Sequence, residues 1–98
     1  MDDVMQLGGN ISLVGFKDLD GGKMVVIKKI TGNYVRKMQD KNNKFESLHL
    51  HLKEVHANKV ELQAKVICDG KPYNSEIVDF NLFFAVDKVL GRILEEIS

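Results

Sequence analysis

The feature that most constrains the fold is a pair of alternating segments in the second half of the chain. Residues 45–55 (FESLHLHLKEV) place Leu48, Leu50 and Leu52 on one side of an extended strand, because successive side chains of a strand point to opposite faces. Residues 60–68 (VELQAKVIC) alternate in the same way. Each segment therefore predicts a strand with one apolar face, and that face must be covered by other elements.

Short turns link these strands and lead into a third. Residues 56–58 (HAN) suit a three-residue hairpin loop, because Asn58 tolerates the left-handed backbone that such a loop needs. The dipeptide at 69–70 (DG) is a hairpin signal that leads into residues 71–78 (KPYNSEIV). Pro72 has no N–H to donate, so it marks the start of that strand or an edge of the sheet.

Two other segments have the helical period. Residues 23–41 repeat apolar side chains at steps of three and four, and Asp20 precedes them as a candidate N-cap. The closing segment, with Asn81 or Asp79 as its cap, has a broad apolar stripe and an unusual Gly91, which either costs stability or admits a close neighbour. The positions that define the two periods are Ile27, Ile30, Tyr34 and Met38, then Leu82, Val86, Val89, Leu90, Ile93 and Ile97.

The order of elements predicts an α+β fold. Residues 11–16 (ISLVGF) add a short strand before the first helix, and residues 1–10 are expected to be a flexible lead-in. Residues 11–98 then form a single βαβββα domain, in which one four-stranded mixed sheet has both helices packed on one face. The side chains expected in its core are Leu48, Leu50, Leu52, Leu62, Val86 and Ile93.

The charges are unevenly distributed along a neutral chain. Residues 23–44 contain seven basic side chains and one acidic side chain, whereas the remainder contains seven basic and thirteen acidic ones. On the first predicted helix, steps of three and four join five side chains into one stripe, called the basic stripe below. With the helices side by side, Lys88 and Arg92 are expected to face that stripe across a groove. The basic stripe consists of Lys29, Asn33, Arg36, Lys37 and Lys41.

The sequence favours a cytoplasmic protein. The longest unbroken apolar run, residues 82–86, is far shorter than the ~20 residues that span a bilayer. The first residues, Met-Asp-Asp, are acidic where a secretory signal is basic. The single cysteine, Cys68, has no internal disulfide partner. A membrane partner is therefore not expected.

The three histidines do not predict a metal site. His49 and His51 share the polar face of their strand, but His56 falls on the other parity or in the loop, and Cys68 faces inward at the far end. Zinc needs three or four suitable ligands, and this face does not supply them. Asp79 and Asp87 make a poor acid–base pair, and the glycine clusters lack phosphate-loop spacing. No catalytic residue, cofactor, metal or small-molecule substrate is predicted.

The closing segment NLFFAVDKVLGRILEEI resembles the end of the ribosome hibernation-promoting factor family, also called the sigma-54 modulation or ribosome-associated inhibitor family. The matching positions are Asn81, Phe83, Ala85, Val86, Asp87 and Arg92. Residues 33–38 (NYVRKM) resemble the family's first helix, and the βαβββα order is the family's order. The chain looks like a divergent, short, archaeal-type relative. It departs from the family at Asn81 and Gly91, in its zero net charge, and in the absence of the extension found in long forms.

This resemblance implies binding to ribosomal RNA of the small ribosomal subunit, which would block the tRNA and messenger channel and store ribosomes idle under stress. The RNA-binding residues expected are the basic stripe together with Lys88 and Arg92. A double-stranded RNA-binding domain has a similar αβββα core, but it needs a basic cluster where this chain has DFNLFFAV. The alternative is a protein-interaction or dimerisation module, in which Phe16, Phe84 and the open sheet face contact a partner.

Overall fold

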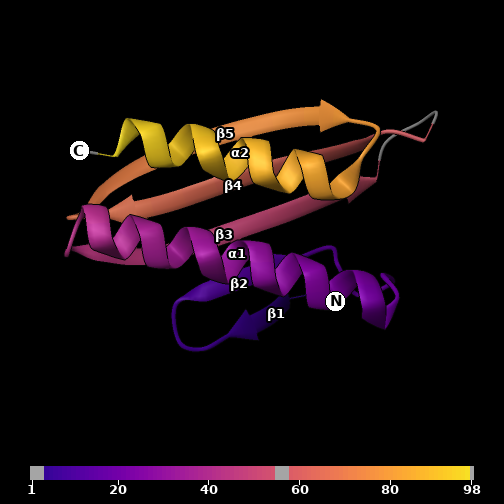
Figure 1. Cartoon of the computed structure of the whole chain (residues 1–98), viewed down its shortest axis with the longest axis horizontal. Coiled ribbons are helices and arrows are strands. Elements are labelled where there is room, and N and C mark those ends of the chain that lie inside the picture. Colours follow the sequence, from indigo (N-terminus) through magenta and orange to yellow (C-terminus); the bar gives the residue numbers. More distant parts are fainter. Residues whose placement is uncertain (1–3, 55–57, 98) are drawn as a thin grey trace.

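A computed structural model describes residues 4–54 and 58–97, which form a sheet of five strands and two helices (Figure 1). The elements are β1 (Val4–Leu7), β2 (Ile11–Val14), α1 (Gly21–Lys41), β3 (Phe45–Glu54), β4 (Val60–Cys68), β5 (Lys71–Asp79) and α2 (Leu82–Glu96). The strands lie in the sheet in sequence order from β1 to β5. The predicted α+β class is confirmed.

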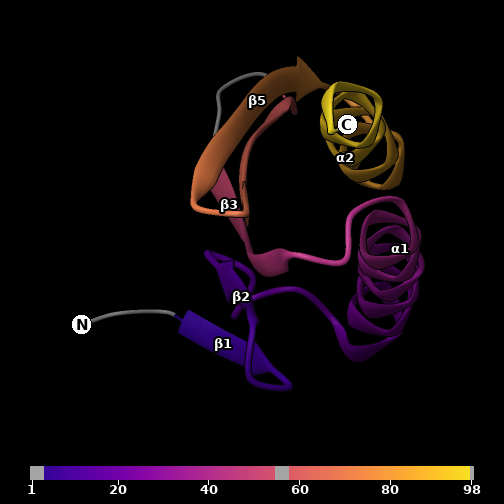
Figure 2. The ribbon, with the colours of Figure 1, turned by 90° about the vertical axis from the view of Figure 1, so that its left-hand side faces the viewer.

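Both helices lie on the same face of the sheet (Figure 2). Strands β2 and β3 are parallel and the other neighbouring pairs are antiparallel. A parallel pair needs a long crossover, which α1 provides. The two helices run in the same direction, with both N-termini at one end of the molecule (Figure 1). The opposite face of the sheet has no helix on it in the part of the chain that the structure describes.

The prediction of four strands is wrong, because residues 4–54 and 58–97 contain five. The additional strand, β1, lies within residues 1–10, where the sequence predicted a lead-in. It pairs antiparallel with β2. Met5 and Leu7 are half-buried and pack against the core, whereas Val4 and Gln6 are exposed. Four residues are too few for a clear period of two, and the glycines that follow them form a hairpin turn instead of a flexible tail.

The core lies between the sheet and the two helices. Leu48, Leu50 and Leu62 are fully buried on the sheet, as predicted, and so are Val86 and Ile93 on α2. Leu52 is only partly buried. It sits near the end of β3, where its backbone lies against Gly15 so closely that a Cβ at that glycine would overlap the Leu52 carbonyl.

Local signals set the N-terminal ends of both helices, as the sequence predicted. The Asp20 side chain accepts a hydrogen bond from the Lys23 backbone N–H at 2.9 Å, and the Asn81 side chain accepts one from that of Phe84 at 3.0 Å. Each bond satisfies a donor that the first helical turn leaves without a partner. Asn81, not Asp79, is therefore the cap of α2.

The hairpin turns also follow the sequence. Asp69 and Gly70 both have positive φ, at 53° and 73°, as a two-residue hairpin turn requires. Asn58 has φ 63°, the left-handed conformation predicted for it. The remainder of that loop, His56 and Ala57, and the last residue of the predicted strand, Val55, lie outside the described residues.

Candidate nucleic-acid interface

The two helices form a layer whose outer surface is open to a partner. The Tyr34 hydroxyl of α1 donates a hydrogen bond of 2.7 Å to the Asp87 carboxylate of α2. Gly91 lies directly beside this contact, since a Cβ placed on it would be 3.3 Å from the Tyr34 hydroxyl oxygen. Asp87 and Gly91 therefore mark the side of α2 that faces α1.

The five side chains of the basic stripe are all exposed on α1. The buried positions of the same helix include Ile27, Thr31 and Met38, which pack toward the sheet. Within the stripe, Lys37 lies over the Tyr34 ring, with its Nζ 5.2 Å from the ring centroid. The stripe therefore begins at the boundary with α2 and extends over the outer side of α1, where Arg36 and Lys29 lie in solvent.

Lys41 links the two C-terminal ends of the helices. Its Nζ donates a hydrogen bond of 2.6 Å to the Leu94 carbonyl in the last turn of α2. That carbonyl belongs to the negative end of the helix dipole, which a cation stabilises. Lys41 is thus part of the fold as well as of the basic stripe.

Lys88 and Arg92 do not face the stripe together across a groove as expected. The Arg92 guanidinium donates a hydrogen bond of 3.1 Å to the Glu76 carbonyl of the edge strand β5. Arg92 lies five positions after Asp87, about 140° around the helix, so it points away from α1. Lys88 is exposed and stacks on Phe84 of its own helix, with Nζ 4.9 Å from the ring centroid.

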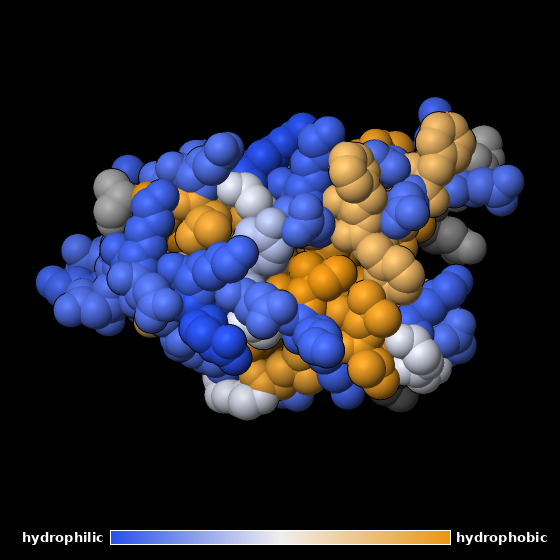
Figure 3. Space-filling view, in the orientation of Figure 1, coloured by the Kyte–Doolittle hydropathy of each residue, from blue (hydrophilic) through white to orange (hydrophobic). Residues whose placement is uncertain are grey.

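Of the exposed apolar area on this layer, the sequence pointed only to Phe84, as a contact residue of the alternative interaction module. Four exposed side chains are involved: Val25 at 65%, Val26 at 38%, Phe80 at 69% and Phe84 at 50%. Apolar side chains gather over the N-terminal halves of α1 and α2 (Figure 3). Phe80 was missed but was detectable in principle, since it precedes the Asn81 cap and falls outside the apolar stripe that α2 packs on the sheet. Phe16, expected at an interface, is instead buried at 1% exposure, because it packs in the core.

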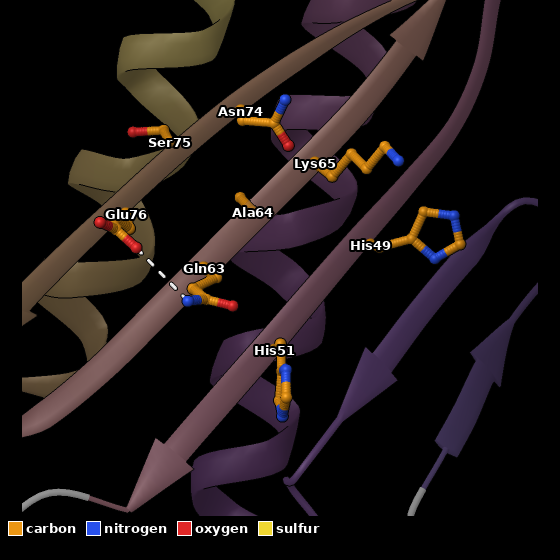
Figure 4. A pocket seen from close by; sticks show the side chains of 8 residues that line it. All are labelled: His49, His51, Gln63, Ala64, Lys65, Asn74, Ser75 and Glu76. Atoms are coloured by element: carbon orange, nitrogen blue, oxygen red, sulfur yellow. Dashed lines mark hydrogen bonds between the residues drawn. The ribbon is translucent and has the colours of Figure 1, made fainter.

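The open face of the sheet has a shallow recess of about 600 Å³. Figure 4 shows its lining side chains, which come from β3, β4 and β5. His49 lies opposite Lys65 and His51 opposite Gln63 in the β3–β4 ladder. The Gln63 amide donates a hydrogen bond of 3.3 Å to the Glu76 carboxylate. These contacts give a mixed polar surface.

The recess does not have the ligands of a metal site. Within residues 4–54 and 58–97, no three His, Cys, Asp or Glu side chains gather in a group that could hold an ion. Cys68 is buried elsewhere in the sheet; burial raises the pKa of its thiol, and the charge of Glu46 adds to the rise, so the thiol stays protonated. Asp79 accepts a hydrogen bond from the Asn81 backbone N–H, and Asp87 accepts one from Tyr34, so both carboxylates have structural partners.

Neither helix in the described part of the chain is long and apolar enough to cross a membrane.

Comparison with known proteins shows the fold. No protein-family model and no curated protein matches the sequence. A ribosomal subunit interface protein from Coxiella burnetii is 12% identical, with a TM-score of 0.62 over 90% of this chain and 90% of that chain. The N-terminal domain of Protein Y from Thermus thermophilus is 16% identical, with a TM-score of 0.67 over 95% and 96%. The predicted resemblance to the fold of the ribosome hibernation-promoting factor family is confirmed.

Proposed function

We propose that this chain is a divergent member of the ribosome hibernation-promoting factor family and acts as a ribosome-binding factor without catalytic activity. The observation that carries the proposal is the likeness in fold, over at least 90% of the chain, to a protein named for the ribosomal subunit interface. The exposed basic stripe on α1 supports it, because its four cations share one side of the helix and can meet a polyanion together.

The proposed contact is electrostatic. The basic stripe and Lys88 would meet phosphates of ribosomal RNA in the small subunit, which fix position without reading bases. Recognition would then depend on the shape of the folded RNA, as is usual for structured RNA. Arg92 uses one of its five N–H donors on β5 and keeps the others for such a contact.

The proposed consequence is occlusion of the tRNA and messenger channel in the cytoplasm, so that ribosomes are held idle under stress. No cofactor and no small-molecule substrate enters this mechanism. Purified protein added to a translation extract should therefore depress protein synthesis in proportion to the share of ribosomes that it occupies.

Sedimentation with ribosomes tests the proposal. Arg36→Glu together with Lys37→Glu replaces two attractions with two repulsions, so the variant should leave the ribosomal fractions of a sucrose gradient at low salt. Lys65→Glu is the matched control for Arg36→Glu alone, because it makes the same charge change on the opposite face of the sheet. If the double variant sediments with ribosomes as well as the wild-type chain does, the basic stripe is only a solvated helix face.

The exposed apolar area favours a second candidate function, that of a protein-interaction or dimerisation module. Phe84 and the neighbouring valines would be its contact surface, without Phe16. Such a contact would tolerate high salt, whereas a phosphate contact would weaken steeply. Self-association that persists in high salt, with no ribosome binding, would favour this function.

A further inference from the structure

Two exposed phenylalanines at the start of α2 are not explained by the proposed phosphate contacts. Phe80 lies between β5 and the cap of α2, and Phe84 lies in the first turn. They are 69% and 50% exposed. Among the described apolar side chains that pack against the core are Leu82 and Phe83, but neither Phe80 nor Phe84. The fold therefore gains little apolar burial from these two rings.

The turn that begins α2 does not require an aromatic side chain. The Asp79 carboxylate accepts the Asn81 N–H at 3.0 Å, and the Asn81 side chain accepts the Phe84 N–H at 3.0 Å. These bonds involve the backbone of Phe84 and not its ring. Smaller or polar side chains at positions 80 and 84 would make the same turn, so the rings call for another explanation.

Each ring is accompanied by a lysine. Lys59 Nζ lies 5.3 Å from the centroid of Phe80, and Lys88 Nζ lies 4.9 Å from that of Phe84. The first pair forms because Val60 is opposite Asp79 in the β4–β5 ladder, which brings their neighbours together. The second pair is one helical turn apart on α2. Two flat apolar surfaces are thus each held beside a positive charge.

A polyanion with flat apolar groups matches this arrangement. We propose that Phe80 and Phe84 form a stacking platform for unpaired RNA bases, with Lys59 and Lys88 as its phosphate contacts. This inference rests on the proposed RNA-binding function and specifies which part of the RNA this end of the molecule recognises. Base stacking on an aromatic ring is stronger than an exposed cation–π contact, so an arriving base displaces the lysine, whose ammonium is then free for the adjoining phosphate.

Two further features favour nucleotides at this end of α2. The N-terminus of α2 is the positive end of its dipole and adds to the attraction for phosphate. Val25 and Val26 on α1 are also exposed, but their aliphatic side chains offer no ring on which a base could stack. Because the two exposed rings at the start of α2 are each paired with a cation, we assign them to RNA and use the valines as a control.

Binding of a labelled single-stranded RNA of about ten nucleotides, alternating adenosine and cytidine, tests the platform by fluorescence anisotropy. Phe80→Leu with Phe84→Leu keeps apolar side chains but removes both rings. This variant should bind the RNA about tenfold or more weakly, since each stacked base is worth roughly 5-fold or more in affinity. Its affinity for an abasic ribose-phosphate strand of equal length should be unchanged. Val25→Ala with Val26→Ala should bind both strands as the wild-type chain does, and Phe84→Trp should restore binding in a Phe80→Leu background.

The outcomes separate this inference from the proposed function. Equal losses on the RNA and the abasic strand, or no loss on either, overturn the platform while ribosome binding through Arg36 and Lys37 stands. If the leucine variant binds RNA normally but loses self-association in sedimentation velocity, the rings belong to a protein interface and the platform is wrong. If the wild-type chain binds neither ribosomes nor the single strand, the proposed function fails and the platform fails with it. Circular dichroism of each variant confirms that it is folded.

Discussion

Tyr34 is a half-buried side chain whose pKa depends on the contact between the helices. Burial, followed by the hydrogen bond to Asp87 and the charge of that carboxylate, raises the pKa of Tyr34 from 10.0 to about 12. Below pH 10 the phenol is protonated in both the folded and the unfolded chain, so it adds no pH dependence. Between pH 10 and about 12 the unfolded chain releases this proton while the folded chain keeps it, and stability falls as pH rises.

We therefore expect the wild-type chain to lose more stability than Tyr34→Phe between pH 10 and 12, measured by urea denaturation at each pH. All groups other than Tyr34 are common to both proteins, so their effects cancel in the comparison. Asp87→Asn should reduce the difference, because it removes the negative charge beside the phenol. Parallel loss in all three proteins would mean that Tyr34 titrates in the folded chain as it does in the unfolded one.

Leu50 tests which face of β3 is buried. Its side chain is fully buried between the sheet and the helices, so Leu50→Ala should cost about 2–5 kcal/mol of unfolding free energy. Val78→Ala is the control, because Val78 is exposed on β5 and its truncation should change stability by less than ~0.5 kcal/mol. Equal effects in thermal or urea unfolding would contradict the assignment of the faces.

At the residue scale, the sequence predicts positions that depend on local chemistry. The Asp20 and Asn81 caps and the left-handed Asn58 follow from a few neighbouring residues, and the structure has all three. Phe16 and Arg92 were misplaced because their partners are distant in the chain. The alternation of a short strand does not reveal that Phe16 is buried in the core. The helical period of α2 does not reveal that Arg92 donates a hydrogen bond to a backbone carbonyl of β5.

At the scale of elements, Gly91 is explained by the approach of α1 to α2. Glycine within a helix is less stable than alanine by about 1 kcal/mol. A Cβ at position 91 would be 3.3 Å from the Tyr34 hydroxyl oxygen, closer than atoms of this kind ordinarily approach, but 3.9 Å or more from the ring carbons. The hydroxyl, not the ring, is therefore the obstacle to alanine.

This geometry predicts a coupling between the two positions. Gly91→Ala should stabilise Tyr34→Phe by about 1 kcal/mol, but should stabilise the wild-type chain by less than half as much, because Tyr34 must shift to make room. A double-mutant cycle by urea denaturation measures the difference. The same gain in both backgrounds would show that Tyr34 does not limit residue 91.

The elements themselves were largely predictable, with one omission. Long alternating segments set β3 and β4, and the helical periods set α1 and α2, close to their observed bounds. Strand β1 was missed because it has four residues and its stability comes from pairing with β2 and from Met5 and Leu7 on the core. Such tertiary support leaves little trace in a short sequence window.

At the scale of the whole molecule, the separation of charge matters more than its sum. A neutral chain binds a polyanion only if its positive side chains share a surface, and the basic stripe meets that condition on α1. The sequence could predict the stripe because it lies on one helix. It could not predict the pairing of Lys59 with Phe80, since Lys59 reaches that ring only through the β4–β5 pairing.

Salt dependence provides the test at this scale. If four to six phosphates are contacted, the logarithm of the affinity for ribosomes should fall against the logarithm of the salt concentration with a slope of about −3 to −5. Arg36→Glu should make the slope shallower by roughly one or more, whereas Lys65→Glu should leave it unchanged. A slope near zero would indicate a contact made through apolar side chains.

From the crossover through α1 we also infer the order in which the chain acquires its structure. Strands β3, β4 and β5 and helix α2 each contact a neighbour that is close in sequence, whereas β2 reaches β3 only after the whole of α1 has been placed. Closing a long loop is entropically costly, so contacts of this kind form late in folding. We expect Leu62→Ala to slow refolding and Leu13→Ala to act mainly by accelerating unfolding. The half of the molecule that bears the basic stripe would then be the last to assemble and the first to come apart.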